Sequence, residues 1–120
     1  SVSLQELLNI ADFISIHLPL QDSTKPLISS AEFEQMKDNV VIINTTRGRV
    51  IDENSLLKAL DKKKVKAIAM SVQENELQEK SKLINHEGVF PTPFLGSLTV
   101  EGQRRTGFDI ISVLKDFFNV

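Results

Sequence analysis

Apolar runs alternate with amphipathic segments along this chain. Four apolar runs have the length of strands, from Phe13 to Leu18, from Val40 to Asn44, from Val65 to Val72, and at Val89 and Phe90. The first run is expected to end at Pro19 and the last at Pro91, because proline has no N–H to donate to a sheet. The continuous run that begins at Val40 suits a strand buried on both faces.

Helix signals lie between these runs. Ser3 with Glu6, and Ser29 with Glu32, have the capping-box spacing of a helix start, and Asp52 is placed to cap a third helix. The chain is expected to be helical again from Ser97, with apolar residues on one face of that helix. These are Ile110, Ile111, Leu114, Phe117 and Phe118. The polar stretch 73–87 is expected to be a loop.

Strands that alternate with helices are typical of a parallel sheet. The sequence therefore predicts one α/β domain over residues 1–120, with about four parallel strands and helices on both faces. A chain of 120 residues has the size of a single domain.

The composition of the chain argues against several classes of function. The net charge is −2, with 14 basic and 16 acidic residues interspersed, which argues against a nucleic-acid-binding surface. The short run from Asp61 to Lys64 is typical of a solvated helix end. There is no cysteine, which excludes disulfides and thiolate chemistry and leaves the redox compartment undetermined. There is no apolar run of membrane length and no signal-peptide pattern, so a cytoplasmic protein is expected. The chain begins with Ser1 rather than methionine, as expected of a processed, excised or engineered fragment.

One predicted turn contains a candidate ligand-binding residue. Thr45, Thr46, Arg47 and Gly48 follow the apolar run that begins at Val40. Open α/β sheets bind ligands at the carboxyl ends of their strands. A planar guanidinium there can hold a carboxylate through two parallel hydrogen bonds. Taken alone, an arginine in such a turn is more often an ordinary surface residue.

Four short segments carry a resemblance to a known family. They are His17-Leu18-Pro19-Leu20, Asn44-Thr45-Thr46-Arg47-Gly48, Ser71-Val72-Gln73-Glu74-Asn75-Glu76-Leu77 and Thr92-Pro93-Phe94-Leu95-Gly96. In this order and at this spacing, the chain resembles the second half of the NAD-binding domain of the D-isomer-specific 2-hydroxyacid dehydrogenases, which include phosphoglycerate dehydrogenase. The resemblance covers nearly the whole chain.

This resemblance implies half of a Rossmann-type doubly wound fold, NAD as the cofactor, and hydride transfer between NAD and a 2-hydroxy or 2-oxo acid. It implies that Arg47 binds the substrate carboxylate and that Glu76 occupies the place of the glutamate that polarises a catalytic histidine. It also implies a set of cofactor-binding positions: Leu18, Pro19, Thr45, Thr46, Ser71, Gly96 and Ser97. No metal site is expected.

The chain differs from the family pattern at positions that the family's reaction requires. Phe94 stands at the position of the catalytic histidine and has no group that can donate or accept a proton. The chain has two histidines elsewhere; His17 is interpreted as structural and His86 as solvated, although position alone leaves both open as substitutes. Ser71 and Leu77 replace the family's aspartate and proline. The phosphate-binding Gly-x-Gly-x-x-Gly is absent from the sequence.

Four hypotheses follow. The chain is a half-domain that is inactive alone, a non-catalytic module that binds a small carboxylate, one chain of a split dehydrogenase, or a self-assembling domain. In the resembled fold, the strand from Phe13 to Leu18 has a neighbour that this chain lacks. We therefore expect a homodimer through this exposed edge or the adjoining faces, with the C-terminal helix as the second candidate interface. The alternative is a monomer whose N-terminal helix covers the edge. Neither nucleic acid nor membrane is an expected partner.

Overall fold

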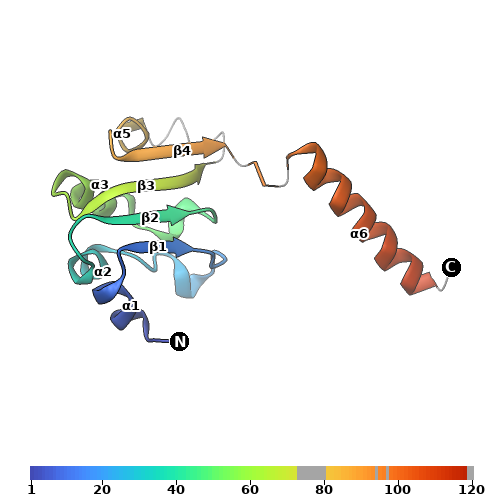
Figure 1. Cartoon of the computed structure of the whole chain (residues 1–120), viewed down its shortest axis with the longest axis horizontal. Helices are drawn as coiled ribbons and strands as arrows, with labels where there is room; N and C mark the ends of the chain where they lie inside the picture. Colours follow the sequence, from blue (N-terminus) through green and yellow to red (C-terminus); the bar gives the residue numbers. More distant parts are fainter. Residues whose placement is uncertain (73–80, 94, 97, 119–120) are drawn as a thin grey trace.

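The computed structural model describes residues 1–72, 81–93, 95–96 and 98–118. Its helices, in chain order, are α1 (Leu4–Ile10), η1 (Asp22–Thr24), α2 (Ser30–Gln35), η2 (Gly48–Val50), α3 (Glu53–Asp61), α5 (Ser81–Ile84) and α6 (Val100–Phe118). Its strands are β1 (Phe13–Ile16), β2 (Val40–Asn44), β3 (Val65–Val72) and β4 (Val89–Pro93). The four strands form one parallel sheet in the order β1-β2-β3-β4 (Figure 1). The predicted α/β fold with four parallel strands is confirmed.

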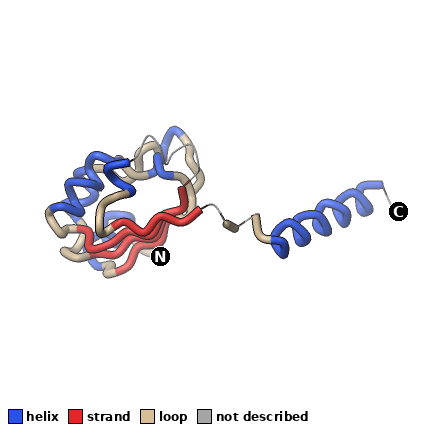
Figure 2. The backbone as a smooth tube through the Cα atoms, turned by 90° about the horizontal axis from the view of Figure 1, so that it is seen from above, coloured by secondary structure: helices blue, strands red, loops and turns tan. Residues whose placement is uncertain are grey.

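The core lies between the sheet and the helices. The buried residues of the sheet include Ile14, Ile42, Ile68 and Val89, one from each strand. The helices contribute Leu8, Phe33, Leu56 and Leu83 to the same cluster. Figure 2 shows the strands as one layer with α2, α3 and α5 on one side of it. Each strand follows the previous one in the same direction across the sheet, and parallel crossovers are right-handed, so these helices fall on the same face.

The opposite face of the sheet is bare. Phe13 is 71% exposed, Ile43 36% and Phe90 57%, whereas their strand neighbours Ile14 and Ile42 are 7% and 0% exposed. The expectation of helices on both faces is therefore met on only one face in the part of the chain that the structure describes. Continuous apolar runs suit two covered faces, but the crossovers of this chain supply helices to one of them.

Side-chain caps fix the helix starts as predicted. Ser3 Oγ accepts a hydrogen bond from the backbone of α1. At α2, Ser29 and Glu32 form the predicted capping box, in which the Ser29 N–H donates to Glu32 Oε2 at 2.8 Å. At α3, Asp52 Oδ1 accepts from the Ser55 N–H at 2.8 Å. These hydrogen bonds favour the charged carboxylates, and they lower the pKa of Glu32, chiefly through Ser29, and of Asp52, chiefly through Ser55.

Two strand boundaries differ from the prediction. β1 ends at Ile16 rather than at Leu18. β4 does not stop at Pro91 but continues to Pro93, with Pro91 opposite Met70 of β3. β4 is the last strand of the sheet, and an edge strand tolerates proline because one of its sides makes no ladder.

A short helix lies within the stretch 73–87 that was predicted as a loop. Residues 73–80 of that stretch fall outside the described residues. After them comes α5, whose Leu83 is 4% exposed and packs into the core. One turn of helix is too short to produce an apolar period in the sequence, which is why the pattern did not indicate it.

The C-terminal helix α6 stands apart from the rest of the molecule (Figures 1 and 2). None of its described residues is buried. The radius of gyration is 17.5 Å, compared with about 14 Å for a compact chain of this length. No helix in the described ranges is both long and apolar enough to cross a membrane.

Candidate functional site

The candidate site lies at the carboxyl edge of the sheet, where the strand arrows end in Figure 1. Because the strands are parallel, the segments that follow them all leave from this edge. His17 follows β1, the Arg47 turn follows β2, and β3 ends with Ser71 and Val72. The resemblance places its candidate residues in these segments, so the fold brings the described ones to one edge.

Asn44, the last residue of β2, organises the turn that carries Arg47. Its side chain is 1% exposed. Asn44 Oδ1 accepts hydrogen bonds from the Thr46 N–H at 3.0 Å and from Thr46 Oγ1 at 2.8 Å. Asn44 Nδ2 donates to the Arg47 carbonyl oxygen at 3.1 Å. A buried amide that satisfies both sides of a turn holds that turn in one shape. Sequence reasoning treated Asn44 as a strand end and as the first residue of a motif, and it gave Asn44 no role of its own, although a polar residue at the end of an apolar run was the available signal.

Arg47 is exposed immediately after this anchor. Its backbone is extended, with φ −132° and ψ 138°, and its Nη1 donates to the Thr46 carbonyl oxygen at 3.2 Å. The segment after Arg47 is also fixed, because a parallel bridge pairs Ile51 with Ile28. In that bridge the Ile28 N–H donates to the Val50 carbonyl oxygen at 3.1 Å. An arginine side chain that reaches solvent from a turn fixed at both ends is suited to binding an anion.

His17 connects the ends of β1 and β2. Its Nε2 lies 2.7 Å from Ser15 Oγ, and its Nδ1 lies 3.5 Å from Thr45 Oγ1. Both ring nitrogens therefore have hydroxyl neighbours, as the structural interpretation of His17 requires. The ring is exposed at the same edge as the Arg47 turn.

The remaining candidates are only partly visible. Leu18 is 46% exposed and Pro19 is also exposed, and Ser71 is half-buried at the end of β3. A methyl group added at Gly96 would meet no atom within 4 Å, so the surroundings of Gly96 do not require glycine. Three candidates, Glu76, Phe94 and Ser97, lie outside the described residues. The roles of all these residues stay predictions.

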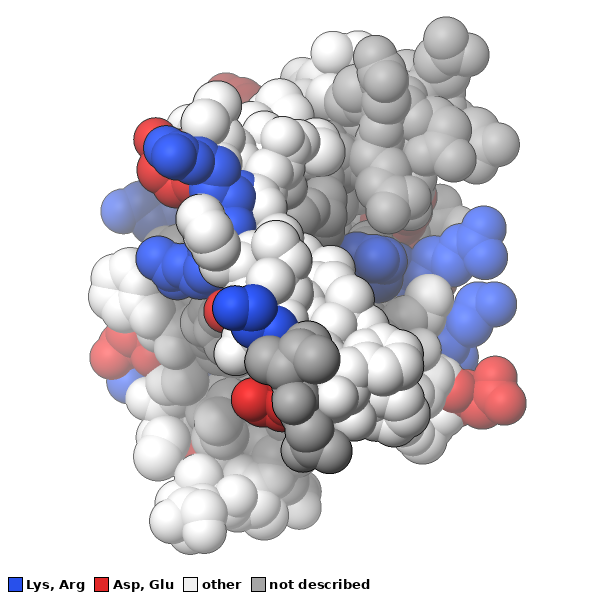
Figure 3. All heavy atoms as spheres, turned by 90° about the vertical axis from the view of Figure 1, so that its right-hand side faces the viewer, with Lys and Arg blue, Asp and Glu red and all other residues white. Residues whose placement is uncertain are grey.

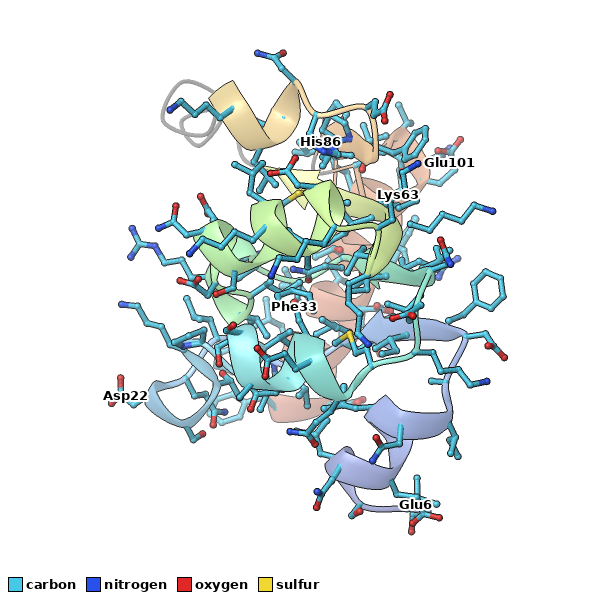
Figure 4. The ribbon with its side chains drawn as sticks, turned by 90° about the vertical axis from the view of Figure 1, so that its left-hand side faces the viewer. Glu6, Asp22, Phe33, Lys63, His86 and Glu101 are labelled. Carbon is cyan, nitrogen blue, oxygen red and sulfur yellow. The ribbon has the colours of Figure 1, made fainter. Side chains whose placement is uncertain are left out.

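His86 lies at the opposite edge of the sheet, and the expectation that it is solvated is wrong. Its side chain is 19% exposed. Its Nδ1 accepts from the Gly88 N–H at 3.0 Å, and its Nε2 lies 3.4 Å from Asp61 Oδ1. Figure 4 views the amino ends of the strands and shows His86 and Lys63 there. Because β4 begins at Val89, His86 is separated from the carboxyl edge of the sheet by the length of that strand.

Charges show no large cluster of one sign on the face that Figure 3 presents, where basic and acidic groups lie next to each other. Within the described ranges, no group of three or more histidine, aspartate or glutamate side chains could hold a metal ion.

The parallel sheet with a polar turn at its carboxyl edge defines the class of protein, an α/β fold of the Rossmann type. Residues 1–96 match the family model described as the NAD-binding domain of D-isomer specific 2-hydroxyacid dehydrogenases. The chain belongs to this family, whose domain binds NAD.

Relatives support this assignment. The chain is 43% identical over 103 residues to 4-methyl-2-oxopentanoate reductase A of Aspergillus oryzae, covering 86% of this chain and 31% of the relative. It is 39% identical over 113 residues to hydroxypyruvate reductase of Thermotoga maritima, covering 92% of this chain and 37% of the relative. A crystal structure of a glyoxylate reductase from Paecilomyes thermophila superposes with a TM-score of 0.85 at 38% identity, covering 95% of this chain and 35% of that chain.

The chain spans about a third of the length of these relatives. It corresponds to one part of their structure, and its likeness to them concerns that part.

Proposed function

We propose that this chain forms the substrate-side half of the NAD-binding domain of a D-2-hydroxyacid dehydrogenase and is inactive alone. The observation that carries this proposal is the Arg47 turn, held at the carboxyl end of β2 by the buried Asn44. Arg47 binds the carboxylate of a 2-hydroxy or 2-oxo acid through its planar guanidinium. The names of the relatives, reductases of 2-oxo acids, agree with this substrate class.

The residues present fit one end of NAD. Thr45, Thr46 and Ser71 place hydroxyl groups at the carboxyl edge, where this fold class binds its ligands. The glycine-rich loop that would bind the pyrophosphate is absent from the sequence. NAD, when bound, supplies or accepts the hydride. This chain orients the acid through Arg47, but it provides no proton donor at Phe94.

An assay of the isolated chain tests the inactivity. We expect no NADH-dependent reduction of 2-oxo acids above background, because general acid–base catalysis contributes about 10²–10⁴-fold and the cofactor site is incomplete. NADH oxidation is followed at increasing concentrations of pyruvate, glyoxylate, hydroxypyruvate and 4-methyl-2-oxopentanoate. Turnover well above background that survives repurification would overturn the proposal. The matched variant is Phe94→His, which restores an ionisable group without restoring the missing loop and is expected to stay inactive.

A second function, carboxylate binding without turnover, is favoured by the combination of an exposed Arg47 and a phenylalanine at position 94. Titration calorimetry with 4-methyl-2-oxopentanoate measures it directly. Arg47→Ala is expected to abolish the heat of binding, and Arg49→Ala, which removes an exposed arginine two residues away, is expected to retain it. Equal losses in both variants would point to non-specific charge attraction.

A further inference from the structure

A groove lies between α2 and α3, in the layer of helices that covers the sheet. Its volume is about 260 Å³. Phe33 and Ala59, which are only 3% and 5% exposed, form its apolar floor. Figure 4 shows Phe33 between the two helices. The groove is therefore a second hollow of the molecule, on a different surface from the Arg47 turn.

Contacts at both ends of the groove hold its two helices in place. Ahead of the helices, Ile28 and Ile51 form a parallel bridge, and the Asp52 N–H donates to the Ile28 carbonyl oxygen at 2.8 Å. Beyond the helices, Lys64 Nζ lies 3.0 Å from Asp38 Oδ1. The groove is therefore formed before a ligand arrives, which lowers the entropic cost of binding.

The walls of the groove carry more positive than negative groups. Its polar lining among the described residues consists of Ser30, Glu34, Ser55, Lys58, Lys62 and Lys64. Lys58 and Lys62 are four positions apart on α3, so they lie on one side of the helix and repel each other. In the part of the chain that the structure describes, no carboxylate lies within ion-pair distance of either ammonium group. An anion in the groove would relieve this repulsion.

We propose that this groove binds a phosphate monoester of a small organic molecule, at a site separate from the Arg47 turn. Such a phosphate carries a charge of about −1.5 to −2 at neutral pH and has three acceptor oxygens. Ammonium and hydroxyl donors on two helices suit oxygens that point in different directions, whereas a planar carboxylate is better matched by the fork of an arginine. The apolar floor contacts the carbon skeleton of the molecule. The volume of the groove is small for a ligand site, so the bound molecule is compact.

The groove does not depend on the proposed function. Arg47 precedes α3 at the carboxyl edge of the sheet, whereas Lys62 and Lys64 lie beyond the other end of that helix. The 9 residues of α3 extend over about 14 Å, which separates the two places. Binding at one of them can therefore be removed while the other is kept.

Titration of the isotope-labelled whole chain with phenyl phosphate, followed by NMR, locates the site. At constant ionic strength we expect saturable shifts of the Ser55, Lys58 and Lys62 amide signals. Inorganic phosphate is expected to shift the same signals with a higher dissociation constant, because it has no ring to contact the floor. Benzoate keeps the ring but carries a carboxylate, and is expected to shift them less. Shifts confined to the Arg47 turn, or equal shifts with benzoate, would overturn the proposal.

Paired variants test which charges bind the phosphate. The double variant Lys58→Gln with Lys62→Gln is expected to raise the dissociation constant of phenyl phosphate by on the order of 10-fold. Lys25→Gln with Lys82→Gln changes the net charge equally at two exposed lysines outside the groove and is expected to leave the constant unchanged. Lys58 and Lys62 are also exposed, so both double variants keep the fold, which circular dichroism verifies. Equal losses in the two would mean general charge attraction and would overturn the proposal. Arg47→Ala should retain binding, and its loss there would mean that the phosphate occupies the candidate substrate site instead.

A short peptide with a central phosphoserine distinguishes a small molecule from a modified protein. Because the groove holds one compact group, we expect the peptide to bind no more tightly than phenyl phosphate. Binding of the peptide that is tighter by on the order of 10-fold, and that is lost when Lys58 and Lys62 are replaced, would identify a phosphorylated protein as the partner. That result would overturn the assignment to a small molecule.

Discussion

The two faces of the sheet are built from neighbouring residues of the same strands and yet have different surroundings. Ile42 is completely buried beneath the helices, and the next residue, Ile43, is 36% exposed on the bare face. Ile14 and Phe13 differ in the same way, at 7% and 71%. The apolar character of a strand therefore shows that a face is suited to burial. Which face is buried within the chain depends on the side to which the crossovers carry their helices.

Truncation of the covered face should have the largest effect. Ile42→Ala removes a buried side chain at the centre of the core and leaves a cavity, so we expect a loss of about 2–5 kcal/mol in the free energy of unfolding. Urea denaturation followed by circular dichroism measures it. Ile43→Ala, one residue along, is the control, and its loss should be less than half as large because its site opens to solvent. Similar losses at both positions would mean that the two faces are equally covered.

On the covered face, β2 ends at Asn44, a buried polar residue that follows the apolar residues of the strand. Asn44→Ala leaves the Thr46 N–H and the Arg47 carbonyl group without their partner, and we expect a loss of about 1–3 kcal/mol in the free energy of unfolding. Asn54→Ala, at an exposed position of α3, should change it by less than about 0.5 kcal/mol. If Asn44→Ala costs no more than Asn54→Ala, the side chain of Asn44 does not hold the turn.

The helices of the covered face depend on their caps. Asp52→Ala removes the acceptor of the Ser55 N–H at the start of α3, and we expect it to cost about 1 kcal/mol. The pKa of Asp52 is lowered in the folded state, as is that of Glu32. A carboxyl group of this kind stabilises the fold above its unfolded pKa, and this stabilisation is lost as the pH falls through the folded pKa.

Unfolding by urea from neutral pH down to below the ordinary aspartate pKa of 3.8 measures this dependence. Stability of the unaltered chain should fall on acidification. The Asp52→Ala variant should show a shallower fall, since the remaining contribution comes from Glu32. A parallel dependence in the two proteins would show that Asp52 is not coupled to folding.

Much of the covered face could be predicted from sequence. The apolar runs at β2 and β3 and the caps Ser29 and Asp52 are local signals, and the structure places them as expected. The bare face could not be predicted, because the direction of each crossover is not encoded in the apolar pattern of any strand. The continuation of β4 through Pro91 depended on its place at the sheet edge, which is also a property of the whole fold.

Part of the candidate site could likewise be predicted from the sequence, and part could not. The position of Arg47 after a buried strand followed from local pattern, and its family role followed from resemblance. The anchoring by Asn44 was missed because it depends on hydrogen bonds between residues two and three positions apart in a particular turn. The partial burial of His86 and its contact with Asp61 were missed because Asp61, 25 positions earlier, meets His86 only in the folded chain.

The smallest effect is expected at the most exposed apolar residue of the bare face. Phe13→Thr replaces a side chain that is 71% exposed with a β-branched residue that suits a strand, so at high dilution we expect the free energy of unfolding to change by less than about 0.5 kcal/mol.

If two copies pair through this face, folding is linked to association, and stability rises with protein concentration. The unaltered chain should then gain stability between nanomolar and high micromolar concentration, while Phe13→Thr gains less. Ile42→Ala should lose the same amount at both concentrations, since its surroundings lie within one chain. A loss at Phe13 that is large at every concentration would show that its own chain already covers the face, and the contrast between the two faces would no longer hold.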